Sequence, residues 1–279
     1  MPNSHFSGAQ RGDFSALRAM SFNIRYDNPG DGLHDWAHRR ERVASILHLH
    51  RPDVLGLQEG RLHQIADLAR TLSEFAWLGV GRDDGASRGE FAAIFYRLGR
   101  LALLDKGNFW LSKTSDVPGS INWDACCIRI VTWAKFFDRA THQEFFFFNT
   151  HFDQASKKAR QKSAELVLER LPSLAGSTPL LLTGDLNCDD ASKPYRILTQ
   201  GLGAWRVEDA RTVSAAPHHG PTTTYHGFDG IYQERIDYIF VANGIRVLRH
   251  ATLADHWDDV YASDHCPVMA DVVIASDAH

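Results

Sequence analysis

The chain has 279 residues, of which 44% are hydrophobic and 23% are charged, and its formal net charge is −4. A chain of this length and composition can bury a large core as one layered α/β domain. The negative charge argues against a protein that grips nucleic-acid backbones without regard to sequence, because such binding needs clustered Lys and Arg. It leaves room for a local basic cleft or a small phosphorylated ligand.

The ends of the chain and its cysteines give information about its cellular compartment. The four cysteines form no CxxC pair, so we expect free thiols in a reducing compartment; they are Cys126, Cys127, Cys188 and Cys266. Residues 1–16 are polar and lack the apolar core of a secretory signal, so we expect a disordered lead-in before a single domain at 17–279. No stretch approaches the roughly 20 apolar residues of a membrane-spanning helix. We therefore expect a cytoplasmic protein with no membrane anchor and no obligate protein partner.

Strands and helices alternate in the first part of the chain. Apolar runs predict strands at 17–24, 53–57 and 91–96, and helical spacing of apolar residues predicts helices at 36–49 and 62–72. Pro52 stops the first of these helices.

The second part of the chain is richer in strands. We predict strands at 101–111, 128–137, 144–150, 180–183, 235–241 and 266–274, and a helix at 157–171. Residues 138–142 predict a hairpin turn, and the Pro, Gly, Thr and His content of 211–232 predicts a long loop over one end. The simplest architecture is α/β, with mixed sheets packed face to face and helices outside.

Polar side chains that can bind a metal or move a proton occur within or just after these apolar strands. They lie in six segments: Ser21-Phe22-Asn23, Gln58-Glu59, Asn149-Thr150-His151, Gly184-Asp185-Leu186-Asn187, Ile236-Asp237-Tyr238 and Ser263-Asp264-His265. Taken singly, each is typical of a turn, a helix cap or a structural polar group. Together they indicate one shared site.

Four of these side chains are acidic, and this composition points to a metal. Burying Glu59, Asp185, Asp237 and Asp264 in one pocket is costly, because like charges repel and desolvation raises carboxylate pKa values. A divalent cation removes that cost. Oxygen ligands favour Mg²⁺ or Mn²⁺ over Zn²⁺, and zinc signatures such as HExxH are absent from the sequence.

The same segments resemble the endonuclease/exonuclease/phosphatase superfamily, which includes DNase I and inositol-polyphosphate 5-phosphatases. The matching motifs are MSFNIRY (20–26), RPDVLGLQE (51–59), NTHFD (149–153), GDLN (184–187), ERIDYIF (234–240) and SDHCPV (263–268). Further stretches, such as SFNIRYDNPGDG and TWAK, resemble the small bacterial metal-dependent hydrolases of this superfamily. The resemblance implies a four-layer α/β sandwich, in which two packed mixed β-sheets are flanked by helices.

The resemblance also implies roles for individual residues. Asn23, Glu59 and Asp264 match positions that hold or orient a catalytic Mg²⁺, for which Mn²⁺ would substitute. The residues at positions of catalytic importance are Asp185 (water activation), Asn187 (an amide at the phosphate or metal), His265 (oriented by Asp237) and His151 (at the phosphate or leaving group).

Four further residues are candidates for substrate binding. Glu90 either orients His151 or is a solvated turn carboxylate, and Arg129 either grips a phosphate or forms a structural ion pair. His226 and Phe228 lie in a loop that resembles a segment of CCR4 and nocturnin deadenylases, so they either contact substrate or anchor the loop.

These features predict a Mg²⁺-dependent phosphoester hydrolase that activates water for in-line attack on phosphorus. Its substrate would be a phosphorylated small molecule or a nucleic-acid end, and the acidic net charge favours the small molecule. One alternative is a 3′ exonuclease or deadenylase-like nuclease. Another is a catalytically idle module that binds phosphoesters; here every core position is filled, which argues against it.

Overall fold

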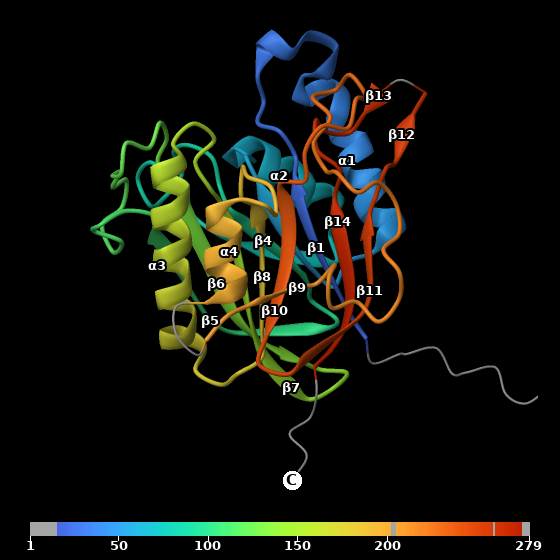
Figure 1. Ribbon diagram of the computed structural model, residues 1–279. Helices are drawn as coiled ribbons and strands as arrows, with labels where there is room; N and C mark the ends of the chain where they lie inside the picture. Colours follow the sequence, from blue (N-terminus) through green and yellow to red (C-terminus); the bar gives the residue numbers. More distant parts are fainter. Residues whose placement is uncertain (1–15, 202–204, 259, 275–279) are drawn as a thin grey trace, which may run out of the picture.

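The computed structural model describes residues 16–201, 205–258 and 260–274, and within them two six-stranded sheets pack face to face (Figure 1). The predicted disordered lead-in lies almost wholly in residues 1–15, outside the described residues. Helices cover the outer face of each sheet, which gives the predicted four-layer α/β sandwich.

The first sheet has the strand order β11-β14-β1-β2-β4-β3. Its strands are β1 (Leu17–Asn23), β2 (Val54–Gln58), β3 (Phe75–Leu78), β4 (Ala93–Arg97), β11 (Ile245–Thr252) and β14 (Val268–Ile274). The pair β1 and β2 is parallel and the other neighbours are antiparallel. α1 (Trp36–His50) and α2 (Leu62–Thr71) cover its outer face (Figure 1).

The second sheet has the order β5-β6-β7-β8-β10-β9. Its strands are β5 (Leu101–Trp110), β6 (Ile130–Asp138), β7 (Gln143–His151), β8 (Leu180–Asp185), β9 (Glu208–Asp209) and β10 (Asp237–Ala242). Here β7 and β8 form the parallel pair. α3 (Lys157–Ala175) and α4 (Lys193–Gln200) cover its outer face. A short 3-10 helix η1 (Pro29–His34) and a small ribbon of β12 (His256–Trp257) and β13 (Val260–Tyr261) complete the described elements.

Three apolar layers hold the sandwich together, and the run Phe145–Phe148 contributes to two of them. Phe145 and Phe147 lie in the layer between the sheets, whereas Phe146 and Phe148 pack toward α3. Successive side chains of a strand point to opposite faces. A strand buried on both faces therefore reads as a continuous apolar run.

The strand directions bring the six polar segments to one end of the sandwich. The parallel strands β1 and β2 end side by side at one end of the first sheet, and β7 and β8 do the same in the second sheet. β10 is antiparallel to β8 and begins opposite its end, with Asp237 paired to Asp185. β14 is likewise antiparallel to β1, so the segment before it lies above the end of β1.

Most predicted elements are confirmed within a few residues, including the hairpin of β6 and β7, and one helix end was wrong. We predicted that the helix beginning at 157 ends at 171, but α3 runs to Ala175 with Pro172 inside it. It ends where Gly176 takes a positive φ of 55° and donates to the Pro172 carbonyl. β3, α4, β9, β11 and the small ribbon had no prediction, because they are short or carry many polar residues.

Candidate active site

The ends of the central strands surround a cavity of about 390 Å³. Of the residues proposed from sequence to form the site, most line it directly: Glu59, Glu90, Arg129, His151, Asp185, Asn187, Asp264 and His265. Asn23 and Asp237 lie immediately behind this lining, fully buried and bonded to it. Residues from both ends of the sequence, such as Asn23 and His265, therefore meet at one place.

A buried chain of groups links Asp237, His265 and Asp185. His265 Nδ1 lies 2.8 Å from Asp237 Oδ2, and its Nε2 lies 3.8 Å from Asp185 Oδ2. Burial opposes protonation of the ring, but the charge of Asp237 and the hydrogen bond to it outweigh burial and raise the pKa of His265 well above 6.5. The raised pKa favours the doubly protonated imidazole, whose Nε2 can donate toward the cavity.

Asn23 joins two carboxylates at the floor of the cavity. Its Nδ2 donates to Glu59 Oε1 and to Asp185 Oδ2, both at 3.0 Å. Burial, followed by the charge of Asp237, raises the pKa of Asp185 to about 7. Burial and the neighbouring Asp237 both disfavour the ionised form of Asp185, so the protein itself compensates the negative charge here poorly.

The residues present fit a divalent cation. Glu59, Asp185 and His265 offer one ligand atom each within 4.8 Å of one another. Because Mg²⁺ prefers oxygen ligands, we take the carboxylates as the metal-holding part of this group. Asp264 lines the same cavity, and its Oδ2 lies 3.8 Å from Arg25 Nη1. Sequence reasoning assigned Asp185 to water activation alone, whereas the structure groups it with Glu59.

His151 lies beside Asp185, with its Nε2 3.4 Å from Asp185 Oδ2. Arg129 Nη1, which can only donate, lies 2.8 Å from His151 Nδ1, and Asn187 Nδ2 lies 2.9 Å from His151 Nε2. Burial and the nearby Arg129 lower the pKa of His151 well below 6.5. The pKa values of the two cavity histidines thus shift in opposite directions, upward for His265 and downward for His151.

Glu90 meets His151 only through Arg129. Its Oε2 pairs with Arg82 and lies 3.5 Å from Arg129 Nη1. Burial raises the pKa of Glu90 despite Arg82. Glu90 is therefore neither a direct partner of His151 nor a solvated turn carboxylate; it orients the arginine that contacts His151.

Sequence reasoning missed a polar network that joins the two sheets beneath the cavity. Gln58 Nε2 donates to Ser21 Oγ and to Asn149 Oδ1, at 3.0 and 2.6 Å. Thr183 Oγ1 also donates to Asn149 Oδ1, at 3.1 Å. All four side chains are fully buried, so the network fixes β2 against β7 and β8. Their place inside apolar strands was the available signal.

Arg39 was missed as well, because an arginine within a charged helix reads as solvated. It is fully buried, and burial lowers its pKa to about 10. Its guanidinium donates to the carbonyl oxygens of Ile24 and Ala262, at 2.7 and 2.8 Å. It therefore ties the end of β1 to the segment that carries Asp264 and His265.

His226 and Phe228, predicted either to contact substrate or to anchor the loop, do not line the cavity. His226 is buried against Tyr261, with ring centroids 4.3 Å apart. Phe228 stacks on His34 at 4.5 Å and covers Arg39. Both contacts are those of loop anchors.

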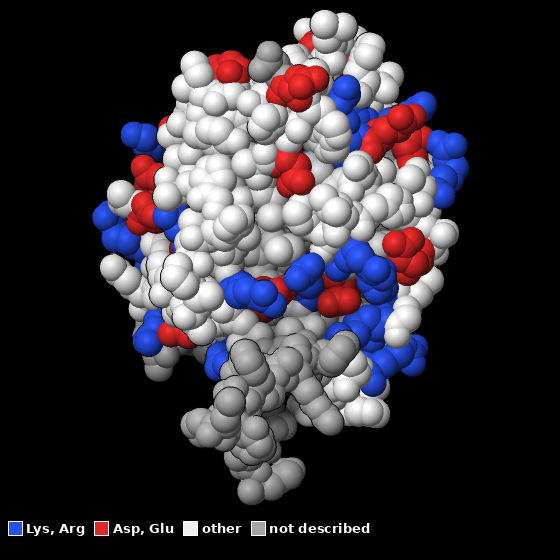
Figure 2. Space-filling view, turned by 90° about the vertical axis from the view of Figure 1, so that its right-hand side faces the viewer, with Lys and Arg blue, Asp and Glu red and all other residues white. Residues whose placement is uncertain are grey.

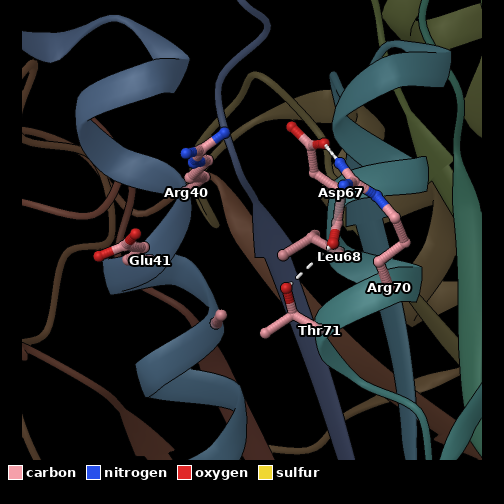
Figure 3. Close-up of a pocket in the computed structure, with 7 residues that line it drawn as sticks. Arg40, Glu41, Asp67, Leu68, Arg70 and Thr71 are labelled. Atoms are coloured by element: carbon pink, nitrogen blue, oxygen red, sulfur yellow. Dashed lines mark hydrogen bonds and ion pairs between the residues drawn. The ribbon is translucent and has the colours of Figure 1, made fainter.

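A separate hollow between α1 and α2 is a poor candidate for chemistry (Figure 3). Asp67 pairs with Arg70 there, and its carbonyl oxygen accepts from Thr71 at 3.1 Å. Arg40 and Glu41 face it from α1, and no buried acid or histidine lies among its described lining residues.

Comparison with known proteins agrees with this geometry. Residues 20–265 match the profile of the Endonuclease/Exonuclease/phosphatase family. The chain belongs to this family. Its members are hydrolases that act on phosphoester bonds.

Solved structures of the family superpose closely on this chain. An endonuclease/exonuclease/phosphatase from Bacteroides vulgatus is 39% identical, with a TM-score of 0.89, and the match covers 93% of this chain and 99% of that one. A mannosyl-6-phosphatase from Bacteroides thetaiotaomicron is 36% identical, with a TM-score of 0.85 and coverage of 92% and 99%. The human nocturnin catalytic domain shares the fold at 18% identity, with a TM-score of 0.74 over 94% of both chains.

Two uncharacterized proteins of Acanthamoeba polyphaga mimivirus are also related in sequence. They are 27% and 24% identical to this chain over 166 and 251 residues. The matches span 61% and 35% of the length of these two relatives.

Proposed function

We propose that this family member is a Mg²⁺-dependent phosphomonoesterase acting on a small phosphorylated molecule, with Mn²⁺ able to substitute. The observation that carries the proposal is the convergence of Glu59, Asp185 and His265, whose ligand atoms lie within 4.8 Å of one another in the cavity. The 36% identity to a mannosyl-6-phosphatase over 92% of the chain supports the monoester preference.

The residues divide the work according to their charges. Glu59 and Asp185, with Asp264 beside them, would hold the cation, which when bound supplies a Lewis acid that neutralises charge on the phosphate. Asp185 also orients the attacking water and accepts its proton. The protonated His265 donates from Nε2 to a phosphate oxygen as negative charge grows there.

Three further side chains would serve the phosphate and the leaving group: Arg129, His151 and Asn187. Arg129 binds the phosphate and keeps His151 oriented through Nδ1. Because Nδ1 accepts from Arg129, the neutral His151 carries its hydrogen on Nε2 and would donate it in a hydrogen bond to the departing oxygen, which stabilises the developing alkoxide. Asn187 Nδ2, which lies 2.9 Å from Nε2, would donate to the same oxygen.

A 3′ exonuclease or deadenylase remains the alternative from sequence, but its support is weaker here. It relied on the loop of Phe228, and Phe228 stacks on His34 outside the cavity. On the side face shown in Figure 2, Lys and Arg gather in a band across the lower half, and Asp and Glu interrupt this band, so it is no continuous basic surface. A nucleic-acid backbone needs such a surface.

Among the described residues, no helix is long and apolar enough to cross a membrane.

A substrate panel tests the proposal. Purified protein with Mg²⁺ is assayed on p-nitrophenyl phosphate, bis-p-nitrophenyl phosphate, sugar phosphates, nucleotides, poly(A) and abasic DNA. We expect the highest kcat/KM on a sugar phosphate or another small monoester. Preference for poly(A) or for the diester would replace this proposal with the nuclease or phosphodiesterase alternative.

A further inference from the structure

The outer wall of the cavity carries an aromatic ring and a carboxylate side by side. Tyr225 and Glu234 both line the cavity, and they face each other across an isolated antiparallel bridge. Tyr225 N donates to the Glu234 carbonyl oxygen at 3.0 Å, and Gln233 N donates to the Tyr225 carbonyl oxygen at 2.9 Å. Residues opposite one another in such a bridge direct their side chains to the same side.

The reacting centre lies directly beside this pair. Tyr225 forms a second bridge with His265, and its ring meets the imidazole edge-on with centroids 5.0 Å apart. A group joined to a phosphate at His265 would therefore extend past the ring of Tyr225 toward Glu234.

The carboxylate of Glu234 is free to bind a ligand. It is exposed and makes no hydrogen bond or ion pair with any described residue. A carboxylate only accepts hydrogen bonds, so it suits hydroxyl groups and repels phosphates.

The cavity has few basic side chains besides the proposed cation. Arg25 and Arg129 are the basic side chains among the described lining residues. Arg25 is held by Asp31 through bonds of 2.9 and 3.1 Å, and Arg129 already contacts His151 and Glu90, so these side chains offer little charge for a second phosphate. A second phosphate near Glu234 would meet a like charge.

We propose that Tyr225 and Glu234 form a subsite for the hydroxyl-bearing part of a phosphorylated polyol, with the ring packing on its apolar face and the carboxylate accepting from its hydroxyls. This inference rests on the proposed phosphomonoesterase function and specifies its substrate class. It makes the enzyme selective for monophosphates of uncharged sugars over bisphosphates and nucleic acid.

Substitutions at Glu234 test the carboxylate. The measurement is kcat/KM for glucose 6-phosphate, glucose 1,6-bisphosphate and p-nitrophenyl phosphate. In Glu234→Ala we expect the selectivity for glucose 6-phosphate over p-nitrophenyl phosphate to fall about 10-fold, mainly through KM, because lost uniform binding raises KM. In Glu234→Lys we expect the ratio of bisphosphate to monophosphate to rise about 10-fold. Glu169→Gln, an exposed change on α3, is the control and leaves both ratios unchanged.

Substitutions at Tyr225 test the ring. Tyr225→Phe should keep the selectivity for glucose 6-phosphate, whereas Tyr225→Ala should reduce it about 10-fold, because only the second removes the packing surface. Equal losses on all substrates, or unchanged ratios in Glu234→Ala and Tyr225→Ala, would overturn the subsite.

Binding calorimetry separates this inference from the proposed function. Glucose 6-phosphate is titrated into Asp185→Asn protein with and without Glu234→Ala. A Kd about 10-fold weaker in the double variant supports the subsite even if the wild-type protein hydrolyses only diesters, which would end the proposed function alone. Equal Kd values overturn the subsite even if the wild-type protein is an active phosphomonoesterase.

Discussion

Asp185 and His265 form the part of the cavity where one substitution removes most of the chemistry. Asp185→Asn removes a carboxylate that faces both Asn23 and His265, and His265→Ala removes the cationic donor beside it. We expect each variant to lower kcat by about 10²-fold or more, since both groups act on charge that develops in the transition state.

The check is steady-state kinetics on p-nitrophenyl phosphate, with circular dichroism and melting temperature as measures of folding. Asp124→Asn, at an exposed carboxylate, is the matched control. Folded Asp185→Asn or His265→Ala protein with near-normal kcat would refute the assigned roles.

Asp138 is the residue at which we test the stability of the fold, because its carboxylate accepts hydrogen bonds that fix the β6–β7 turn. Arg100 donates to it twice, at 2.6 and 2.9 Å, and Ala140 N and Thr141 Oγ1 also donate to it. Burial raises the pKa of Asp138, but hydrogen bonds led by Arg100 outweigh it and bring the net value below 3.8. A depressed pKa means that the stabilisation is present above about pH 4 and is lost as the pH falls through the folded-state value.

Asp138→Asn should therefore lower the free energy of unfolding by about 2 kcal/mol at pH 7, as expected for lost charge-assisted hydrogen bonds. The difference from wild type should shrink when the pH is taken below 3.8. Urea titrations at several pH values measure it, and Asp105→Asn, an exposed position on β5, is the control. A difference that stays constant with pH would contradict the role of the ionised carboxylate.

At the scale of elements, the two sheets approach each other closely at Gly56 on β2. A Cβ built there would lie 2.3 Å from Thr183 Oγ1 and 2.5 Å from Asn149 Oδ1. Gly56→Ala must therefore push β2 away from β7 and β8 and strain the network beneath the cavity. We expect it to destabilise the protein by about 1–3 kcal/mol, the usual range for overpacking, and to reduce kcat as well.

Gly99→Ala is the control for this experiment, because a Cβ there meets nothing within 4 Å. Denaturation midpoints and kcat are compared for the two variants. If Gly56→Ala matched Gly99→Ala in both, the two sheets would not be held this closely.

For the whole molecule, the decisive test is removal of the metal. EDTA should abolish hydrolysis, and Mg²⁺ or Mn²⁺ should restore it. Because the cation binds only the folded state, it should also raise the melting temperature. Cation at about 100 times its Kd adds about 2.7 kcal/mol of stability. Glu59→Gln should lose this shift and Glu169→Gln should keep it. Full activity in the chelator would remove the metal from the mechanism.

That residues 17–279 form one domain stays a prediction, and the shared core between the sheets gives it a test. Ala19 and Val54 of the first sheet pack in one cluster with Phe147 and Leu181 of the second. We expect a single cooperative unfolding transition that coincides when followed by fluorescence and by circular dichroism. Two separate transitions would indicate two units.

The sequence by itself determined the family, the layers and the identity of the residues at the strand ends. Apolar periodicity is a local property, so β1, α1, β2 and the Phe145–Phe148 strand are readable without coordinates. Metal-competent side chains inside such strands are equally readable, because a core strand has no local reason to carry them.

Only the tertiary structure decided which of these side chains touch and how each is charged. Packing between distant segments decides three of these contacts. It groups Asp185 with Glu59, and it places Arg129 between Glu90 and His151. It also stacks Phe228 on His34. The opposite pKa shifts of His151 and His265 depend on this packing as well, since a pKa follows from burial and neighbouring charges. Burial and long-range proximity are properties of the folded chain, and local sequence patterns do not encode them.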